Sequence, residues 1–307
     1  MMNARRTVLQ GMALGAMALG LAPCLMAQGE LHSTDLGQGF TLISGAGTNV
    51  LVAEGVDGVI IVDGGSQAQA EPLLAEIRRL CGDKPVTALF NTNWRPERAG
   101  LNYLLGPQGI PIIAHENARL WQNADVYVGW QDIEYQPMPK EAQANQTFYQ
   151  TGSLRFDNET VEYGFISQAN TDSDIYVHFT QADILFVGAM LNPDSYLLLD
   201  YVTGGWISGA QETTRGLLER AGDDTRIIAA TSGVLDKAAL EEQLGMLDHA
   251  YDVVAKAFQT GRSLEDFLAS DPMADYRARY GDPTLFLRLL YRGTWYHIPG
   301  RAVRNII

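Results

Sequence analysis

Four polar side chains lie close together in residues 91–100, and their types decide what chemistry this segment can support. Asn93 carries an amide and Glu97 carries a carboxylate. Arg95 and Arg98 carry guanidinium groups, which bind carboxylates or phosphates through a planar fork of donors. A carboxylate beside such groups can act as a general base. The two fixed positive charges would repel a metal dication, so this segment is a poor metal site.

Two apolar runs flank this segment. Residues 86–90 precede it and residues 110–114 follow it, and both are short and rich in the residues that favour strands. The polar segment is therefore predicted to be the loop that leaves a buried strand. In α/β folds, functional groups often lie at this position.

The residue order of this loop resembles a known metal-binding motif. The loop reads Asn-Thr-Asn-Trp-Arg-Pro-Glu-Arg-Ala-Gly, and in the metallo-β-lactamase superfamily a strand ends in Asn-Thr-His-Trp-His-Pro-Asp-His-x-Gly. The frame, including Trp94, is retained. Asn93 and Arg95 stand at the positions of the first two histidines, and Glu97 and Arg98 stand at those of the Asp-His pair.

Other landmarks extend the resemblance over residues 36–245. They are the Asp-Gly-Gly turn at 63–65, the segments 112–117 and 171–174, and the strand end at 186–188. The resemblance implies a fold in which two metal ions generate a hydroxide nucleophile for hydrolysis. The remaining ligand positions hold Asn170 for the third histidine, Ala189 for the bridging Asp and Thr231 for the last histidine. We therefore expect neither a metal nor another cofactor.

The hydrophobic pattern predicts two halves that each run from strands to helices. In the first half, residues 40–43, 49–53 and 58–62 are strand-like, and Leu73, Leu74, Ile77 and Leu80 form one face of a helix. The second half repeats this order over residues 161–230. We predict an α/β fold, a four-layer αββα sandwich spanning residues 28–245, with a helical extension over 246–307 packed on it. Residues 126–158 show little periodicity and are predicted to be a long loop with short helices over the site.

The N-terminus has the pattern of an export signal. Arg5 and Arg6 precede a mildly apolar run, and a cleavage pattern ends at Ala27, so residues 1–27 are predicted to be a twin-arginine-like signal peptide. A periplasmic or secreted bacterial location would follow, with no stable membrane span after signal removal. A short membrane anchor and a lipoprotein attached through Cys24 are the alternatives.

Charge and composition limit the partners. The net charge is −14 and the pI is about 4.7, which argues against nucleic acid as a partner because phosphate binding needs clustered cations. The two cysteines, Cys24 and Cys81, fit neither a zinc knuckle nor a redox pair. His115 and His178 fall at positions that are structural in the family.

Three functions remain open for this sequence. The first is a non-catalytic binder of a small anionic molecule or a partner protein, with the ligand held by Arg95, Arg98, Glu97, Asn93, Asn170 and Trp94. The second is a hydrolase of esters or thioesters that works without metal, with Glu97 as base and an arginine stabilising the oxyanion. The third is a structural subunit. In the simplest packing, Glu97 would pair with one arginine while the other arginine faces solvent.

Overall fold

The computed structural model describes residues 29–297, and the side chains of residues 29–294. The predicted signal peptide lies outside the described residues, as do the last ten residues of the predicted extension. No helix in the part of the chain that is described has the length and hydrophobicity needed to cross a membrane.

The first sheet has seven strands in the order β1-β2-β3-β4-β5-β6-β9. Its first four strands pair antiparallel, and β4, β5, β6 and β9 pair parallel. The strands are β1 (His32–Gly37), β2 (Phe40–Ser44), β3 (Val50–Glu54), β4 (Val59–Val62), β5 (Val86–Phe90), β6 (Ile112–His115) and β9 (Gln146–Phe148). The parallel strands all point their carboxyl ends to one edge, so the loop after β5 lies at that edge.

The second sheet has six strands in the order β10-β11-β12-β13-β14-β15. All neighbours are antiparallel except β13 and β14, which are parallel. The strands are β10 (Thr151–Phe156), β11 (Glu159–Gly164), β12 (Tyr176–Phe179), β13 (Ile184–Gly188), β14 (Arg226–Ala229) and β15 (Val234–Leu235).

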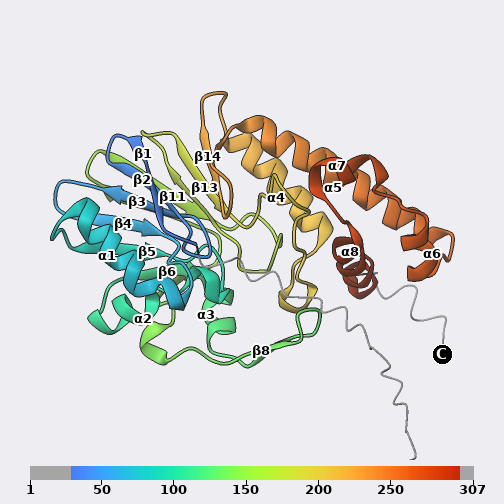
Figure 1. The fold of residues 1–307 in the computed structure, drawn as a ribbon, viewed down its shortest axis with the longest axis horizontal. Helices are drawn as coiled ribbons and strands as arrows, with labels where there is room; N and C mark the ends of the chain where they lie inside the picture. Colours follow the sequence, from blue (N-terminus) through green and yellow to red (C-terminus); the bar gives the residue numbers. More distant parts are fainter. Residues whose placement is uncertain (1–28, 298–307) are drawn as a thin grey trace, which may run out of the picture.

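Helices cover the outer face of each sheet (Figure 1). The α-helices are α1 (Ala70–Cys81), α2 (Asn102–Leu105), α3 (Glu116–Gln122), α4 (Ile207–Arg220), α5 (Lys237–Gln259), α6 (Leu264–Ala269), α7 (Arg277–Tyr280) and α8 (Thr284–His297). Single 3₁₀ turns are η1 (Gln67–Gln69), η2 (Pro96–Arg98), η3 (Gly106–Gln108), η4 (Lys140–Ala142), η5 (Tyr201–Thr203) and η6 (Ala274–Tyr276).

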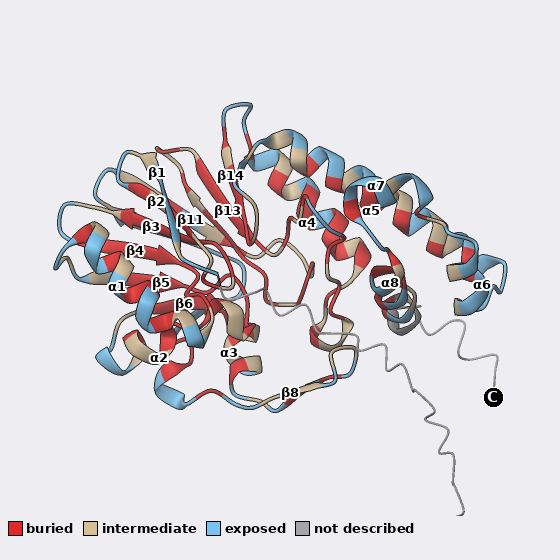
Figure 2. Cartoon of the chain, in the orientation of Figure 1, coloured by how far each residue is buried: buried red, intermediate tan, exposed pale blue. Residues whose placement is uncertain are grey.

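The apolar side chains form a buried layer between the two sheets, and further layers lie between each sheet and its helices. Phe90 from the first sheet and Phe179 and Phe186 from the second are fully buried in the central layer. In Figure 2 the strands at the centre of the sheets, such as β3, β4 and β13, are almost entirely buried. The period-two alternation of side chains lets each strand face both layers. The four-layer αββα prediction is confirmed.

The segment 126–158 differs from its prediction. It is not a loop with short helices, because it contains the hairpin of β7 (Val126–Val128) and β8 (Ile133–Tyr135), the turn η4 and the strands β9 and β10. The strands are short and half-exposed, so polar residues alternate with apolar ones and mask the strand pattern. Part of the prediction holds, since the β7–β8 turn reaches the candidate site described below.

The C-terminal helices share a core with the second sheet. Leu240, Leu247 and Val254 of α5 and Phe286 and Leu290 of α8 are buried in the same apolar cluster, which also contains residues of β13, β14 and α4. The predicted boundary at residue 245 falls inside α5, whose two ends both contribute to this cluster.

Candidate functional site

The loop after β5 is held in place by buried amides rather than by regular structure. Asn91 Nδ2 donates to Arg98 O (3.1 Å) and to Asn102 Oδ1 (3.0 Å), and Asn102 Nδ2 donates back to Asn91 Oδ1 (2.7 Å). Pro96 occupies the first position of η2, where its missing N–H costs nothing. These contacts fold the loop back on itself, so its side chains point into the molecule.

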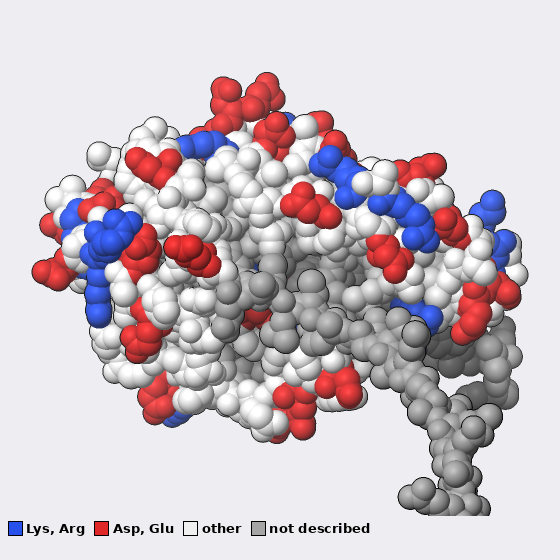
Figure 3. Space-filling model, in the orientation of Figure 1, with Lys and Arg blue, Asp and Glu red and all other residues white. Residues whose placement is uncertain are grey.

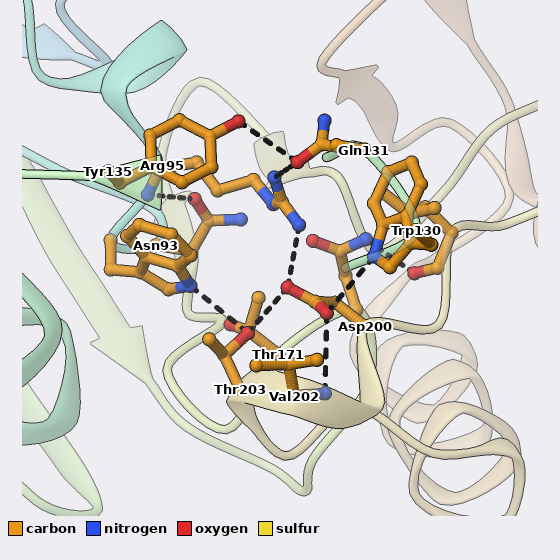
Figure 4. A network of polar contacts seen from close by, with 12 residues as sticks. Asn93, Arg95, Trp130, Gln131, Tyr135, Thr171, Asp200, Val202 and Thr203 are labelled. Atoms are coloured by element: carbon orange, nitrogen blue, oxygen red, sulfur yellow. Dashed lines mark hydrogen bonds and ion pairs between the residues drawn. The ribbon is translucent and has the colours of Figure 1, made fainter. Parts of the chain in front are cut away.

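Arg95 is almost completely buried, with 5% of its surface exposed. Its Nη2 donates to Asp200 Oδ2 at 2.6 Å, and its Nη1 donates weakly to Gln131 Oε1 at 3.4 Å. The guanidinium carbon lies 5.3 Å from the ring centre of Trp94 and 5.8 Å from that of Trp130. Figure 4 shows Arg95, Asp200 and the surrounding side chains pointing toward one another. The cation is thus fixed between two indole rings and a carboxylate.

Asp200 collects donors from several segments. It is fully buried, and besides Arg95 its carboxylate accepts from Thr203 Oγ1 (2.8 Å), Trp130 Nε1 (3.3 Å) and Val202 N (3.3 Å). Thr203 Oγ1 in turn accepts from Trp94 Nε1 at 3.2 Å. This dense set of donors compensates the cost of burying a charge.

Arg98 makes a second, looser pair. Its Nη1 donates to Thr48 Oγ1 at 2.9 Å and lies 3.7 Å from Asp63 Oδ2. Asp63 is fully buried and has a left-handed backbone (φ 62°), and its carboxylate accepts from both N and Oγ1 of Thr92, at 2.8 and 2.9 Å. Asp63 therefore connects the end of β4 to the loop after β5 and faces Arg98.

A third carboxylate, Asp174, fixes Asn93. Asn93 Nδ2 donates to Asp174 Oδ1 at 2.9 Å, and Asn93 Oδ1 accepts from Arg95 N at 3.1 Å. Asp174 also accepts from Thr171 N. Burial raises the pKa of both Asp63 and Asp174 to about 6, although the neighbouring Arg98 and the hydrogen bonds oppose that shift.

The other three predicted positions lie on loops of the second sheet. Asn170 is buried; its Nδ2 donates to Leu198 O (2.5 Å), and its backbone O accepts from Asp200 N (2.9 Å). Ala189 is the first residue after β13, and Thr231 is the second residue after β14. Ala230, beside Thr231, accepts from Thr48 Oγ1 at 3.1 Å.

The predicted residues therefore come together in two neighbouring groups. Asn93, Trp94 and Arg95 lie in the group around Asp200, to which the backbone of Asn170 is also bonded. Arg98 belongs to the group of Asp63 and Thr48, which is tied to the loop that carries Thr231.

The expected pairing of Glu97 is wrong. Both arginines are buried and paired with aspartates, so neither faces solvent, and Glu97 forms no ion pair with either one among the described residues. The physical reason is that aspartates on other loops are already buried beside the guanidinium groups. Glu97 contributes to raising the pKa of Tyr135, after the larger effect of burial.

Several buried polar atoms at these positions have no hydrogen-bond partner. They are Arg95 Nε, Arg98 Nε, Glu97 Oε2 and Asn170 Oδ1, two donors and two acceptors. In the described chain only three further buried side-chain atoms, on Ser66, His178 and Tyr196, lack such a partner. Buried polar groups are normally satisfied, so this concentration at the predicted positions marks a place where a polar molecule could bind.

The side chains at these positions do not fit a metal centre. Two are guanidinium groups, one is a methyl group, and none is an imidazole or a thiolate. Within residues 29–294, no three His, Cys, Asp or Glu side chains converge to hold a metal ion. The geometry agrees with the expectation from the sequence that the family's metal ligands are replaced.

Sequence reasoning missed the acidic residues of the site. The sequence identifies Asp63 only as part of a turn and Asp174 only as part of the landmark segment 171–174, and it gives no role to Asp200, Trp130 or Gln131. An aspartate directly after an apolar strand, as in Asp63, is a usable signal of a buried carboxylate. No local pattern identifies Asp200, which lies 105 positions from Arg95 in the sequence.

Comparisons with known proteins agree with this fold. The chain matches the model of the Metallo-beta-lactamase superfamily over residues 44–231. A metallo-beta-lactamase from Pontibacter korlensis superposes with a TM-score of 0.57 at 17% identity, covering 71% of this chain and 99% of that protein. The DIM-1 metallo-beta-lactamase gives 0.57 at 19% identity, with coverages of 72% and 99%.

A larger enzyme superposes over more of the chain. The stereoselective inverting sec-alkylsulfatase from Pseudomonas sp. gives a TM-score of 0.69 at 14% identity and covers 89% of this chain, which spans 52% of that enzyme. No curated protein sequence matches the chain significantly. At these identities the solved structures establish the fold alone.

The Arg95–Asp200 pair can be tested by removing its negative charge. Asp200→Asn keeps the size of the side chain but leaves a buried guanidinium without its counter-charge, and we expect it to lower the free energy of unfolding by ~3–5 kcal/mol. Asp248→Asn is the control, because it breaks an exposed pair with Arg215 and should cost less than about 1 kcal/mol. Urea unfolding measures both, and equal losses would contradict the assignment.

A second prediction concerns pH. In the folded protein the pKa of Asp63 and of Asp174 is about 6, whereas the ordinary pKa of an aspartate is 3.8. Their protonated forms therefore stabilise the fold fully below pH 3.8, and this stabilisation is lost as the pH rises through 6. Asp174→Asn removes one titrating group. Its free energy of unfolding should therefore rise relative to the wild type between pH 4.5 and pH 6.5. A difference between Asp174→Asn and the wild type that stays constant with pH would exclude the raised pKa.

Proposed function

This chain belongs to the metallo-β-lactamase superfamily, and we propose that it is a non-catalytic member that binds a small anionic molecule. The Arg95–Asp200 pair is the observation that carries the proposal. At a position where the resemblance places a metal-binding histidine, the chain has a fixed cation that is already neutralised by a buried carboxylate. A metal ion there would have to displace the guanidinium and would meet its charge.

The unpartnered atoms indicate what kind of ligand fits. Arg95 Nε and Arg98 Nε are donors, and Glu97 Oε2 and Asn170 Oδ1 are acceptors. A molecule with one acidic group and one hydroxyl or amino donor would satisfy both kinds. A ligand with several negative charges fits poorly, because Asp200, Asp63 and Asp174 already surround the arginines.

Entry of a ligand requires the β7–β8 turn to move. Trp130 and Gln131 of this turn lie against Arg95, and the Gln131 contact is long at 3.4 Å. Arg95 Nε is buried beside these contacts, so opening of the turn would expose this donor. We propose that the β7–β8 turn acts as the lid of the site.

A metal-free hydrolase is the second candidate. Glu97 Oε2 is buried and accepts no hydrogen bond, so the carboxylate is available as a general base if a substrate reaches it. Arg95 or Arg98 would then stabilise the oxyanion. Such a pair suits an activated ester or thioester. Export to the periplasm is proposed from the signal-like pattern of residues 1–27 alone.

Metal content and turnover test the proposed function together. The protein is purified without chelators and analysed for metals, and the same sample is assayed with a β-lactam, an activated ester and a thioester. We expect less than stoichiometric metal and no turnover above the Glu97→Gln control. A stoichiometric transition metal would contradict the proposal, and metal-free turnover lost in Glu97→Gln would establish the hydrolase instead.

Ligand class is tested with lactate and its uncharged analogue lactamide. A ligand that binds only the folded state raises the unfolding temperature, so lactate should stabilise the wild type more than lactamide does. Arg98→Lys keeps a positive charge beside Asp63 but lacks Nε, and it should lose this difference. Arg215→Lys, at an exposed ion pair, is the control that should keep it. Equal stabilisation by both compounds would exclude an acidic ligand.

A further inference from the structure

A cavity of about 600 Å³ lies beside the N-terminus of α3, and none of the residues that carry the unpartnered atoms of the first site lines it. Its size is typical of small-molecule sites. Nine residues line it: His115, Asn117, Tyr149, Gln150, Thr151, Phe165, Ile166, Gln168 and Asp172. None of them was a candidate in the sequence analysis apart from His115, which was expected to be structural.

One wall of this cavity is aromatic. The rings of His115 and Phe165 stack with centroids 4.6 Å apart and an interplanar angle of 29°, and Tyr149 meets His115 edge-on at 6.0 Å. The wall is held together by the β9–β10 turn, where Gln150 O accepts from Phe165 N at 2.7 Å. A flat ring bound in the cavity would find a flat partner there.

The hydrogen bonds of His115 fix it as a neutral ring. Asn117 N donates to Nδ1 (3.2 Å), so the proton lies on Nε2, which donates to Tyr149 O (3.0 Å). Burial also lowers the pKa of His115. With both nitrogens engaged, His115 acts as an aromatic surface and does not supply a positive charge to the cavity.

Asp172 is the only residue with a charged side chain among the nine, given a neutral His115. Its Oδ1 accepts from Trp121 Nε1 at 2.7 Å, and its backbone N donates to Thr203 O at 2.8 Å, so the carboxylate is held in a fixed position. Arg119, two positions after the lining residue Asn117, is paired with Glu116. No lysine or arginine lines the cavity, so the Asp172 carboxylate is the one charged group that a ligand would meet in its lining.

We propose that this cavity binds a small planar cation, a flat aromatic or conjugated group that carries a protonated nitrogen. The ring lies on the wall of Phe165 and His115, and the nitrogen donates to Asp172. The carboxamides of Asn117, Gln150 and Gln168 supply further polar contacts at the edge of the ring. This inference does not depend on the proposed function, which concerns an acidic ligand beside the arginines.

Three probes of one shape test the charge preference. Benzamidinium, benzamide and benzoate carry one positive charge, no charge and one negative charge, and isothermal titration calorimetry measures their affinities. A charge-assisted hydrogen bond in place of a neutral one should make benzamidinium bind about tenfold or more tightly than benzamide. Benzoate should not bind in this cavity.

Two variants and one control locate the binding. Asp172→Asn keeps an acceptor for Trp121 and should remove the preference for benzamidinium over benzamide. Phe165→Leu should weaken both probes about equally. Glu162→Gln changes an exposed carboxylate of β11 that does not line the cavity, and it should bind as the wild type does. Benzoate binding as tightly as benzamidinium, or an unchanged benzamidinium affinity in Asp172→Asn, would overturn the proposal.

Discussion

The buried pair of Arg95 and Asp200 is the constraint on which the candidate site depends. It joins the loop after β5 to the loop between β13 and α4, and the indole rings of Trp94 and Trp130 lie against the guanidinium. A buried ion pair is expensive to desolvate and is tolerated when further hydrogen bonds satisfy both partners. Here the Asp200 carboxylate accepts hydrogen bonds from Thr203, Trp130 and Val202, whereas Arg95 Nε has no hydrogen-bond partner. The pair therefore holds the loops together and leaves one donor for another molecule.

A common physical problem links this pair to the rest of the superfamily. Loops from two sheets meet at one edge of the sandwich, and their polar groups need a partner that lies between them. A metal ion bound by imidazoles and carboxylates is one solution. In this chain Arg95, after β5, makes this connection directly by pairing with Asp200 of the second half. Arg98 pairs with Asp63 within the first half, and its partner Thr48 donates to Ala230 O of the second half. On the face drawn in Figure 3, basic side chains lie among acidic ones.

Much of the fold could be predicted because it follows from local patterns. The hydrophobic periodicity predicts strands β2 to β5 and helix α1, and the structure has all of them. The hairpin of β7 and β8 was missed because short, half-exposed strands have mixed polarity. The candidate loop was found from its motif, but its partners were not. Asp200 and Asp63 lie far from the arginines in sequence, whereas Glu97 is close to both. The sequence therefore predicts Glu97 as the ion-pair partner, and this prediction is wrong.

The most direct test is anomalous diffraction at the zinc edge from crystals of the full chain grown with excess zinc. We predict that the guanidinium of Arg95 lies against the carboxylate of Asp200 and that no anomalous peak appears among Asn93, Arg95, Glu97, Arg98 and Asn170. A zinc peak coordinated by these side chains, or by Asp63, Asp174 or Asp200 with the arginines displaced, would contradict the replacement of the metal centre by arginine–aspartate pairs.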